Sequence, residues 1–494
     1  MWAHFFAVQK AERDNYIKPN TLGFDAIIGN PPYVRIQNLV KYSLKEIEYY
    51  RSSYSPYSVS KKDNFDKYYL FLERAISLLN PKGLLGYIVP HKFFIVKGGR
   101  KLRKAISENI NIAKIIHFGV VQIFPGRSTY TAILVLDKKD RERLSFKRVV
   151  NLKVENAFKR TQGIEYNCED FSELPWVFIS EEANKLFKKM AVAGTLPLKD
   201  IADIPVGLQT SADKIFIFKP EKETERTYLF IQDGTSWEIE KSITLPSLYD
   251  VSINLFDTPV ANSVIIFPYE ITDDGIEVYS EKKMKEKFPK CWLYLNHHKP
   301  KLEKRSINGK DPLWYQYGRS QSLTKFHNTP KLIFPVLSTG QSYAYDEKDI
   351  QFTGGGNGPY YSVTSTSDYS IFYFLGLLSH PAIEAMVKSR ASEFRGEYYS
   401  HGKQYIENLP IKAINFENKE EKSKHDEIVR LVKNLINTRA SIRALYDPGK
   451  KAVLQRKYKR LWNTLTVQIN ELYHIDNDDI KVISGNQLFA AELE

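Results

Sequence analysis

The feature that most constrains the fold is a short apolar segment that ends at two prolines. Residues 24–29, Phe-Asp-Ala-Ile-Ile-Gly, are followed directly by Asn30-Pro31-Pro32-Tyr33. An apolar run of this length predicts a short buried strand, and two consecutive prolines cannot continue its ladder of backbone hydrogen bonds. We therefore expect a strand that stops at residue 29 and is followed by a stiff loop.

Helix and strand patterns alternate over the next hundred residues. The predicted elements are helices over 65–80 and about 98–110, and strands over 84–89, 112–118 and 131–136. The first helix stops at Pro81-Lys82-Gly83, and the strand after it stops at Pro90. Strands that alternate with helices predict an α/β layered sheet.

The pattern changes after about residue 150, and 494 residues are too many for one core. We expect a connector over 151–195 with a helix at about 181–191. An α+β domain is predicted over 196–412, with short strands and few helices except near 368–391. The remaining segment, 413–494, is charged and helical. Its two long helices are predicted over 419–445 and 450–474, separated at Asp447-Pro448-Gly449.

The charge balance favours a polyanionic partner. Lys and Arg number 71 against 58 Asp and Glu, which gives a net charge of +13. Cys168 and Cys291 are the sole cysteines and form neither a disulfide framework nor a zinc set, which fits a cytoplasmic protein. His297-His298 lacks nearby ligands, so we expect no metal, and no stretch has the length of a membrane span.

The residue types of Asn30-Pro31-Pro32-Tyr33 suit chemistry on an amino group attached to an aromatic base. Such an amine is a weak nucleophile because its lone pair is delocalised into the ring. The Asn30 side-chain oxygen and the Pro31 carbonyl can accept its two hydrogens, and the prolines fix these acceptors in advance. The Tyr33 ring can stack on the base, which must first leave the duplex. The alternative is an ordinary proline-rich turn.

Residues 24–34 resemble motif IV of the Taq-type (gamma-class) adenine-N6 DNA methyltransferases. Residues 63–94 resemble the helix–strand unit that follows it in that family. Phe124-Pro125-Gly126 with residues 129–136 resembles motif VIII. The start of the family's C-terminal specificity domain is similar to residues 206–214, and its end is similar to residues 398–411. The resemblance covers nearly the whole chain, and motif IV is its most specific part.

The resemblance implies a role for individual residues. Asn30, Pro31 and Tyr33 would hold the flipped adenine, with Pro32 stiffening the loop, and Phe124 would stack on the other face of the base. Phe71 would pack against the adenine ring of the co-substrate S-adenosylmethionine. The alternatives are that Phe71 is a core residue of an apolar helix face and that Phe124 anchors a loop.

One expected motif is missing. The glycine-rich motif I, which holds the methionine part of S-adenosylmethionine in that family, does not occur before Phe24, and Thr353 to Gly358 is better explained as a loop. We therefore expect a partial class I methyltransferase (Rossmann-like) sheet with an incomplete cofactor pocket. The strand at 24–29 would be an edge carrying Ile27 and Ile28. A separate chain could supply the N-terminal cofactor-binding half, or the chain could be a truncated remnant.

Two stretches of the specificity region mix aromatic, amide and cationic side chains. Residues 314–321 include Arg319 and Gln321, and residues 390–403 include Arg395 and Lys403, so these four are candidate DNA contacts. Ordinary solvated loops are the alternative. Residues 450–460 carry six cations, for which a solvated helix face and a phosphate-contacting face both remain open.

The leading hypothesis is the catalytic-loop and target-recognition portion of an adenine-N6 DNA methyltransferase from a type II/IIG restriction–modification system. It would transfer methyl from S-adenosylmethionine to a flipped adenine in double-stranded DNA. The alternative is a truncated or split-subunit DNA-binding specificity module without independent catalysis. A third hypothesis, an RNA or protein methyltransferase, is disfavoured because the specificity-domain resemblance indicates duplex DNA.

Overall fold

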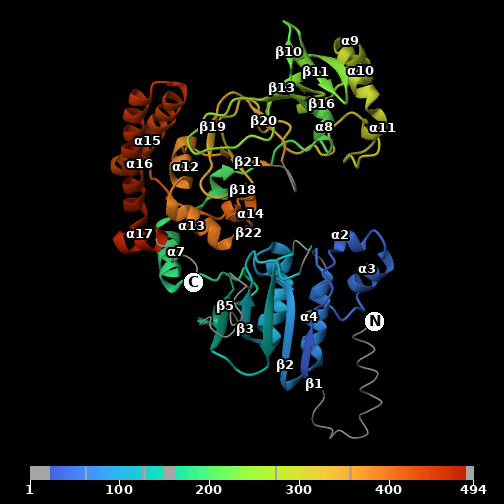
Figure 1. Cartoon of the computed structure of the whole chain (residues 1–494), viewed down its shortest axis with the longest axis vertical. Coiled ribbons are helices and arrows are strands. Elements are labelled where there is room, and N and C mark those ends of the chain that lie inside the picture. The colour runs from blue at the N-terminus through green and yellow to red at the C-terminus, as the bar shows by residue number, and fades with distance from the viewer. Residues whose placement is uncertain are drawn as a thin grey trace. The chain divides into compact units, whose positions relative to one another are not determined.

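The computed structural model describes residues 23–61, 64–124, 126, 129–149, 163–272, 275–354 and 359–484. The chain divides into two compact units (Figure 1). The first comprises Met1–Asn184, Ser389–Glu397 and Ser484–Glu494, and the second comprises Lys185–Lys388 and Tyr398–Ile483. The predicted domain boundaries at 150, 195 and 412 stay predictions.

The first unit is built from one sheet with helices packed on it. Its elements in chain order are β1 (Phe24–Gly29), α2 (Ile36–Leu39), α3 (Leu44–Arg51), α4 (Lys67–Leu78), β2 (Leu79–Pro90), α5 (Arg100–Asn109), β3 (Asn111–His117), β4 (Thr131–Asp137), β5 (Arg143–Arg148) and β6 (Ile164–Asn167). The elements predicted over this region are confirmed with ends shifted by a few residues, most at β2, which starts five residues early. The short strands β5 and β6 were not predicted.

The six-stranded sheet has the order β1-β2-β4-β3-β5-β6. β1 pairs with β2 in parallel, with Ala26 opposite Leu84 and Gly29 opposite Tyr87. β4 runs antiparallel to both β2 and β3, and β3 runs parallel to β5. The carboxyl ends of β1 and β2 therefore lie at the same edge of the sheet, which is where α/β sheets place their ligands.

β1 is an edge strand among the described residues, as predicted, because it pairs with β2 alone. The expectation that it is a buried strand was wrong. No side chain of β1 is fully buried, and Ile28 is 89% exposed. A strand with one neighbour can cover only part of its surface, so the apolar composition of 24–29 did not translate into burial.

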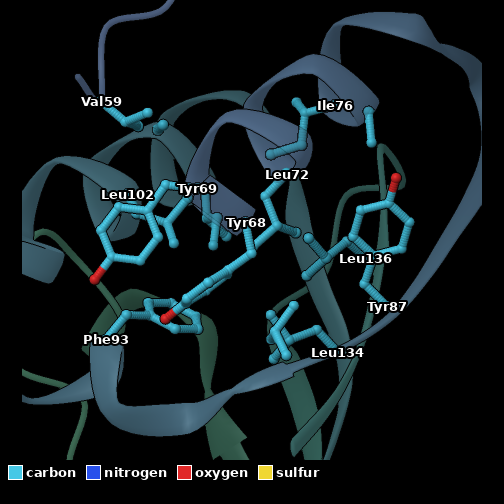
Figure 2. Close-up of a cluster of buried hydrophobic side chains, with 14 of the residues drawn as sticks. Val59, Tyr68, Tyr69, Leu72, Ile76, Tyr87, Phe93, Leu102, Leu134 and Leu136 are labelled. Carbon is cyan, nitrogen blue, oxygen red and sulfur yellow. The ribbon is translucent and has the colours of Figure 1, made fainter. Parts of the chain in front are cut away.

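The core of the first unit lies between α4, α5 and one face of the sheet. Figure 2 shows Leu72 of α4 directed toward Leu136 of β4, and the Tyr68 ring extending toward Phe93. Apolar side chains three, four and seven residues apart form one stripe along α4, which is why this segment is an amphipathic helix. Burying a side chain such as Leu72 contributes about 1.5–3 kcal/mol.

The second unit consists of short strands in several small sheets together with helices. Its strands are β7 (Leu196–Pro197), β8 (Ala202–Asp203), β9 (Ile217–Phe218), β10 (Lys222–Glu223), β11 (Thr227–Gln232), β12 (Thr235–Glu240), β13 (Thr244–Leu248), β14 (Ser263–Ile266), β15 (Tyr269–Thr272), β16 (Gly275–Val278), β17 (Lys331–Pro335), β18 (Leu337–Ser338), β19 (Ala344–Asp346), β20 (Gln351–Phe352), β21 (Tyr360–Ser365), β23 (Tyr398–Ser400) and β24 (Pro410–Ile411). β22 (Glu393–Phe394) lies in the part of this region that belongs to the first unit.

Its helices are more numerous than the sequence indicated. They are α7 (Glu181–Ala193), which begins in the first unit, α8 (Asp213–Phe216), α9 (Glu281–Lys287), α10 (Pro289–His297), α11 (Lys299–Leu302), α12 (Ile371–Leu378), α13 (Pro381–Arg390), α14 (Lys403–Ile406), α15 (Lys419–Ala444), α16 (Pro448–Tyr473) and α17 (Asn477–Ser484). The expectation of few helices outside 368–391 was wrong for α9 and α10. Pro289 is the first residue of α10, where the fixed φ of proline favours a helix start rather than a break.

The two long predicted helices are confirmed as α15 and α16, which lie side by side (Figure 1). Asn418 caps α15, and Asp447 caps α16 by accepting a hydrogen bond from the Lys450 amide at 2.9 Å. Pro448 is the first residue of α16, so the predicted break at Asp447-Pro448-Gly449 is a helix start.

Candidate active site

The Asn30–Tyr33 loop lies at the carboxyl ends of the two parallel strands β1 and β2. Asn30 follows β1 directly and is exposed, whereas Pro31 is buried. The Tyr33 hydroxyl donates a hydrogen bond to the Ile88 carbonyl at 2.9 Å, near the end of β2. This bond and the buried proline hold the loop against the sheet while the Asn30 amide stays accessible.

The Tyr33 ring is surrounded by other aromatic rings. Its centroid lies 6.1 Å from that of Tyr68 at 77° and 6.4 Å from that of Phe124 at 65°. Burial raises the pKa of Tyr33 to about 12, so its hydroxyl remains a donor at neutral pH. The structure thus brings Tyr33 and Phe124 together edge to face. Stacking on the two faces of one base would require one ring to turn.

The chain after Tyr33 is tied to the start of α4. The Lys67 amide donates to the Val34 carbonyl at 2.8 Å, and the Ile36 amide donates to the Phe65 carbonyl at 3.2 Å. Between these bonds lies Asp66, whose pKa is raised by burial and lowered in part by the cations of Arg35 and Lys92. Asp66 was not predicted as a special residue, because it fell inside the helix predicted over 65–80. In the structure it directly precedes α4, and its side chain makes no capping hydrogen bond.

Two histidines at the ends of β2 and β3 were also missed. The rings of His91 and His117 have centroids 4.2 Å apart. Burial lowers the pKa of His91 to about 4 and that of His117 well below its ordinary value. His117 Nδ1 accepts from the Gly119 amide at 3.0 Å, and His91 Nε2 lies 3.3 Å from the Gly119 carbonyl. The pair is therefore neutral at pH 7. The available signal was the position of His91 just after the predicted strand 84–89 and of His117 near the end of the predicted strand 112–118.

Phe71, the predicted contact for the cofactor adenine, is half-buried on α4 and packs against the core of the first unit. Among the described residues it makes no ring contact with Tyr33 or Phe124. The described residues also hold no glycine-rich turn between a strand and a helix on the open side of β1.

The four candidate DNA contacts fall into three places. Arg319 and Gln321 lie next to Gln209: the Arg319 amide donates to the Gln209 carbonyl at 3.2 Å, and the two glutamine side chains are hydrogen-bonded. Lys403 at the start of α14 lies 3.9 Å from an Asp203 carboxylate oxygen. Arg395 is exposed on the turn after β22, in the first unit.

Arg305 holds together the loop that carries Gln209 and the loop that leads to Arg319 and Gln321. This role of Arg305 was not predicted. Its guanidinium donates to the carbonyls of Thr210 at 2.5 Å, Trp314 at 2.7 Å and Gln316 at 2.9 Å. These carbonyls belong to two loops that are about a hundred residues apart in the sequence. Only their meeting in the fold reveals the role of Arg305 as a positioning residue.

The loop lies in a region that is similar to a known protein family. Residues 2–124 match the profile of the Eco57I restriction-modification methylase. The Eco57I-type region, residues 2–124, contains Asn30, Tyr33, Phe71 and Phe124.

Similarity to individual relatives extends beyond the Eco57I-type region. The chain is 30% identical over 484 residues to the type II restriction enzyme and methyltransferase RM.Eco57I of Escherichia coli, covering 94% of this chain and 48% of that protein. It is 24% identical over 462 residues to the type II methyltransferase M.HincII of Haemophilus influenzae, covering 88% of this chain and 83% of that protein. The chain therefore spans about half the length of RM.Eco57I.

The fold is similar to that of a solved restriction-modification enzyme. The Type IIL enzyme MmeI in complex with DNA superposes with a TM-score of 0.61 at 12% identity, covering 93% of this chain and 56% of that chain. At this identity the likeness concerns the fold alone. It supports a mixed α/β architecture of the same kind.

Two further findings concern only the described residues. No helix among them combines the length and the apolar composition that crossing a membrane requires. No three of their His, Cys, Asp or Glu residues lie close enough together to hold a metal ion. Cys168 is half-buried and Cys291 is buried, and both are free thiols.

Proposed function

We propose that the chain is the catalytic-loop and target-recognition portion of an adenine-N6 DNA methyltransferase of a restriction–modification system. The observation that carries the proposal is the Asn30–Tyr33 loop itself. It follows a strand at the carboxyl edge of an α/β sheet, is anchored by the bond from Tyr33 to Ile88, and has Phe124 beside it. The match of this region to the Eco57I methylase profile supports the same function.

The chemistry follows from the groups of this loop. The exposed Asn30 amide oxygen and the Pro31 carbonyl would accept the two hydrogens of adenine N6, which draws its lone pair out of conjugation with the ring. Tyr33 and Phe124 would hold the flipped base by stacking. S-adenosylmethionine, when bound, would supply the methyl group, and the part of this loop is to hold adenine N6 with its lone pair free for transfer. The acceptors are fixed before the base arrives, and such preorganisation lowers the barrier.

S-adenosylmethionine is the proposed methyl donor, with Phe71 packing against its adenine ring. A separate chain that supplies the glycine-rich half of the pocket is part of this proposal. Target recognition is assigned to residues 196–412, where Gln209, Arg319 and Gln321 present amide and guanidinium groups suited to base edges in double-stranded DNA. We place this activity in the cytoplasm.

The test is methyl transfer from labelled S-adenosylmethionine to duplex DNA, with the full chain alone and with an added polypeptide that carries a glycine-rich methylase half. Asn30→Ala should reduce N6-methyladenine formation by about 100-fold or more, because one preorganised acceptor is lost. Asn38→Ala, an exposed asparagine on α2 outside the loop, is the matched control and should change little. Full activity of Asn30→Ala, or a methylated product other than N6-methyladenine, would overturn the proposal.

A further inference from the structure

The first half of α16 carries a set of cations that no acid balances. They are Lys450, Lys451, Arg456, Lys457, Lys459 and Arg460, and the one acid of the helix is Glu471, near its other end. Five of the six side chains are exposed, and Lys451 is half-buried. Among the described residues, none of the six takes part in an ion pair with a carboxylate.

The neighbouring helix α15 is a suitable comparison, because it has the same length as α16 and packs against it. Three of its cations pair with acids of the same helix: Lys422 with Asp426 at 2.7 Å, Lys424 with Glu420 at 2.7 Å, and Arg430 with Glu427 at 2.6 Å. A helix face whose function is only to be solvated is expected to mix both signs in this way. α16 departs from that pattern, so its charge calls for another explanation.

The position of the cations along α16 strengthens this argument. Lys450 and Lys451 lie in the first turn, which contains no acid. The N-terminus of a helix is the positive end of its dipole, so cations are unfavourable there and anions are favoured. The sequence therefore concentrates positive potential at this end of the helix, at a cost to its stability.

A row of polar side chains continues the basic face along the helix. A shallow groove of about 500 Å³ runs past Arg456, Lys459, Arg460, Asn463, Thr464 and Gln468, with Val467 among them. Positions three, four, seven, eight and twelve residues after the first lie on one face of a helix. This face extends over about 18 Å at 1.5 Å per residue. Cationic groups and neutral hydrogen-bond donors are the side chains that proteins use to contact phosphate.

The packing of α16 fixes the direction of this face. Leu465 and Ile469 are fully buried on the opposite side of the helix. The Trp462 ring packs edge to face on Phe256, with centroids 5.5 Å apart. α15 is held to the same loop, because Arg439 pairs with Asp257 at 3.0 Å. The hairpin of α15 and α16 is thus a rigid support that presents the cations to solvent.

We infer that this outward face of α16 binds the phosphate backbone of duplex DNA without reading its sequence. The choice of DNA as the partner rests on the proposed function. Phosphates follow one another along each strand of a duplex, so the three cations of this face, Arg456, Lys459 and Arg460, can make about three phosphate contacts. Base recognition stays with other residues, and α16 adds affinity and fixes the orientation of the duplex.

The experiment compares two triple variants of the full chain in binding to a fluorescent random-sequence duplex over a salt series. Arg456→Gln, Lys459→Gln and Arg460→Gln together should lower the slope of log K against log salt concentration by about 2–3, because each lost phosphate contact removes about 0.9. Affinity near 0.1 M salt should fall by about tenfold or more. Glutamine is a good helix former, and an unchanged circular dichroism spectrum would confirm that α16 is intact.

The matched control replaces three paired cations of α15: Lys422→Gln, Lys424→Gln and Arg430→Gln. It removes the same formal charge and should leave the slope within about 0.5 of the unaltered chain, because these cations already have acids as partners. Equal losses in both variants, or an unchanged slope in the α16 variant, would overturn the inference alone. Absence of duplex binding by the unaltered chain would overturn both proposals. Salt-sensitive binding through α16 without Asn30-dependent methylation would support the inference and overturn the proposed function.

Discussion

Burial holds Tyr33, His91 and His117 of the first unit in defined protonation states. Tyr33 keeps its hydroxyl proton because its pKa is raised to about 12, and it uses that proton to anchor the loop on Ile88. His91 and His117 are neutral, and the nearby cation of Arg148 further disfavours their charged forms. A buried imidazole that cannot be protonated in the folded state makes the stability of the first unit depend on pH.

The sign of this dependence follows from His91. In the unfolded chain a histidine binds a proton below about pH 6.5, whereas folded His91 does so only near pH 4. The stability is therefore present above pH 6.5 and is lost as the pH falls toward 4. One such histidine contributes a slope of at most about 1.4 kcal/mol per pH unit in this window.

We predict that His91→Gln flattens the pH dependence of the first unit between pH 6.5 and 4. Hydrogen exchange of the β2 and β4 amides would report the opening free energy of this unit at each pH. His327→Gln, at a histidine whose side chain is 54% exposed, is the control and should leave that dependence unchanged. A slope in His91→Gln equal to that of the unaltered chain would contradict the assignment of a neutral buried His91.

At the scale of elements, the pairing of β1 with β2 carries the catalytic loop, and two glycines in this ladder have opposite surroundings. A Cβ added at Gly29 would lie 2.9 Å from Cε1 of the Tyr87 ring. A Cβ added at Gly86 would meet no atom within 4 Å. The glycine before Asn30 therefore allows β1 to approach the buried Tyr87, whereas the glycine in β2 has no such constraint.

We predict that Gly29→Ala destabilises the first unit by about 1–3 kcal/mol, because the Tyr87 ring or the strand must move to accommodate the methyl group. Gly86→Ala is the matched control and should be neutral or stabilising by up to about 1 kcal/mol, because alanine reduces the entropy of the unfolded chain. Chemical denaturation followed by circular dichroism measures both. A cost for Gly86→Ala as large as that for Gly29→Ala would show that side-chain crowding at Tyr87 is not the cause.

The same elements show how far sequence reasoning extends. β1, α4 and β2 were predictable because their signals are local: apolar runs, helical spacing and prolines at the ends. The short strands β5 and β6 were not, since Arg143–Arg148 is mostly polar and forms a strand through pairing with β3 and β6. The residues of the candidate site divide in the same way into predictable and unpredictable ones. Asn30–Tyr33 was predicted from a motif, whereas the neutral histidine pair depends on burial, which no local pattern shows.

At the scale of the whole molecule, local sequence patterns do not show which segments far apart in the chain come into contact. Gln209 lies beside Arg319 and Gln321, more than a hundred residues later. The first unit also includes Ser389–Glu397, which lies more than two hundred residues after Asn184 in the chain. Such pairings arise from the packing of complete elements, so composition and spacing cannot predict them.

The ion pair between Arg148 and Glu393 is one contact that holds this segment in the first unit. Arg148 Nη2 donates to Glu393 Oε2 at 2.7 Å across 245 positions of the chain, and the two side chains are only 12% and 20% exposed. Arg148 belongs to β5 and Glu393 to β22, and Arg395 is exposed two residues after Glu393. A largely buried ion pair is worth more than a surface pair, because removing one partner leaves a desolvated charge uncompensated.

We predict that Glu393→Gln loosens the segment, so that trypsin cleaves the peptide bond after Arg395 more readily. A loss of about 2 kcal/mol for a hydrogen bond between charged groups corresponds to about 30-fold faster cleavage after Arg395, because cleavage follows the population of the opened segment. Glu427→Gln breaks a comparable pair with Arg430, but those side chains are 61% and 35% exposed, so its effect on cleavage should stay below about threefold. Equal cleavage rates in the two variants would mean that the ion pair of Arg148 does not hold the segment.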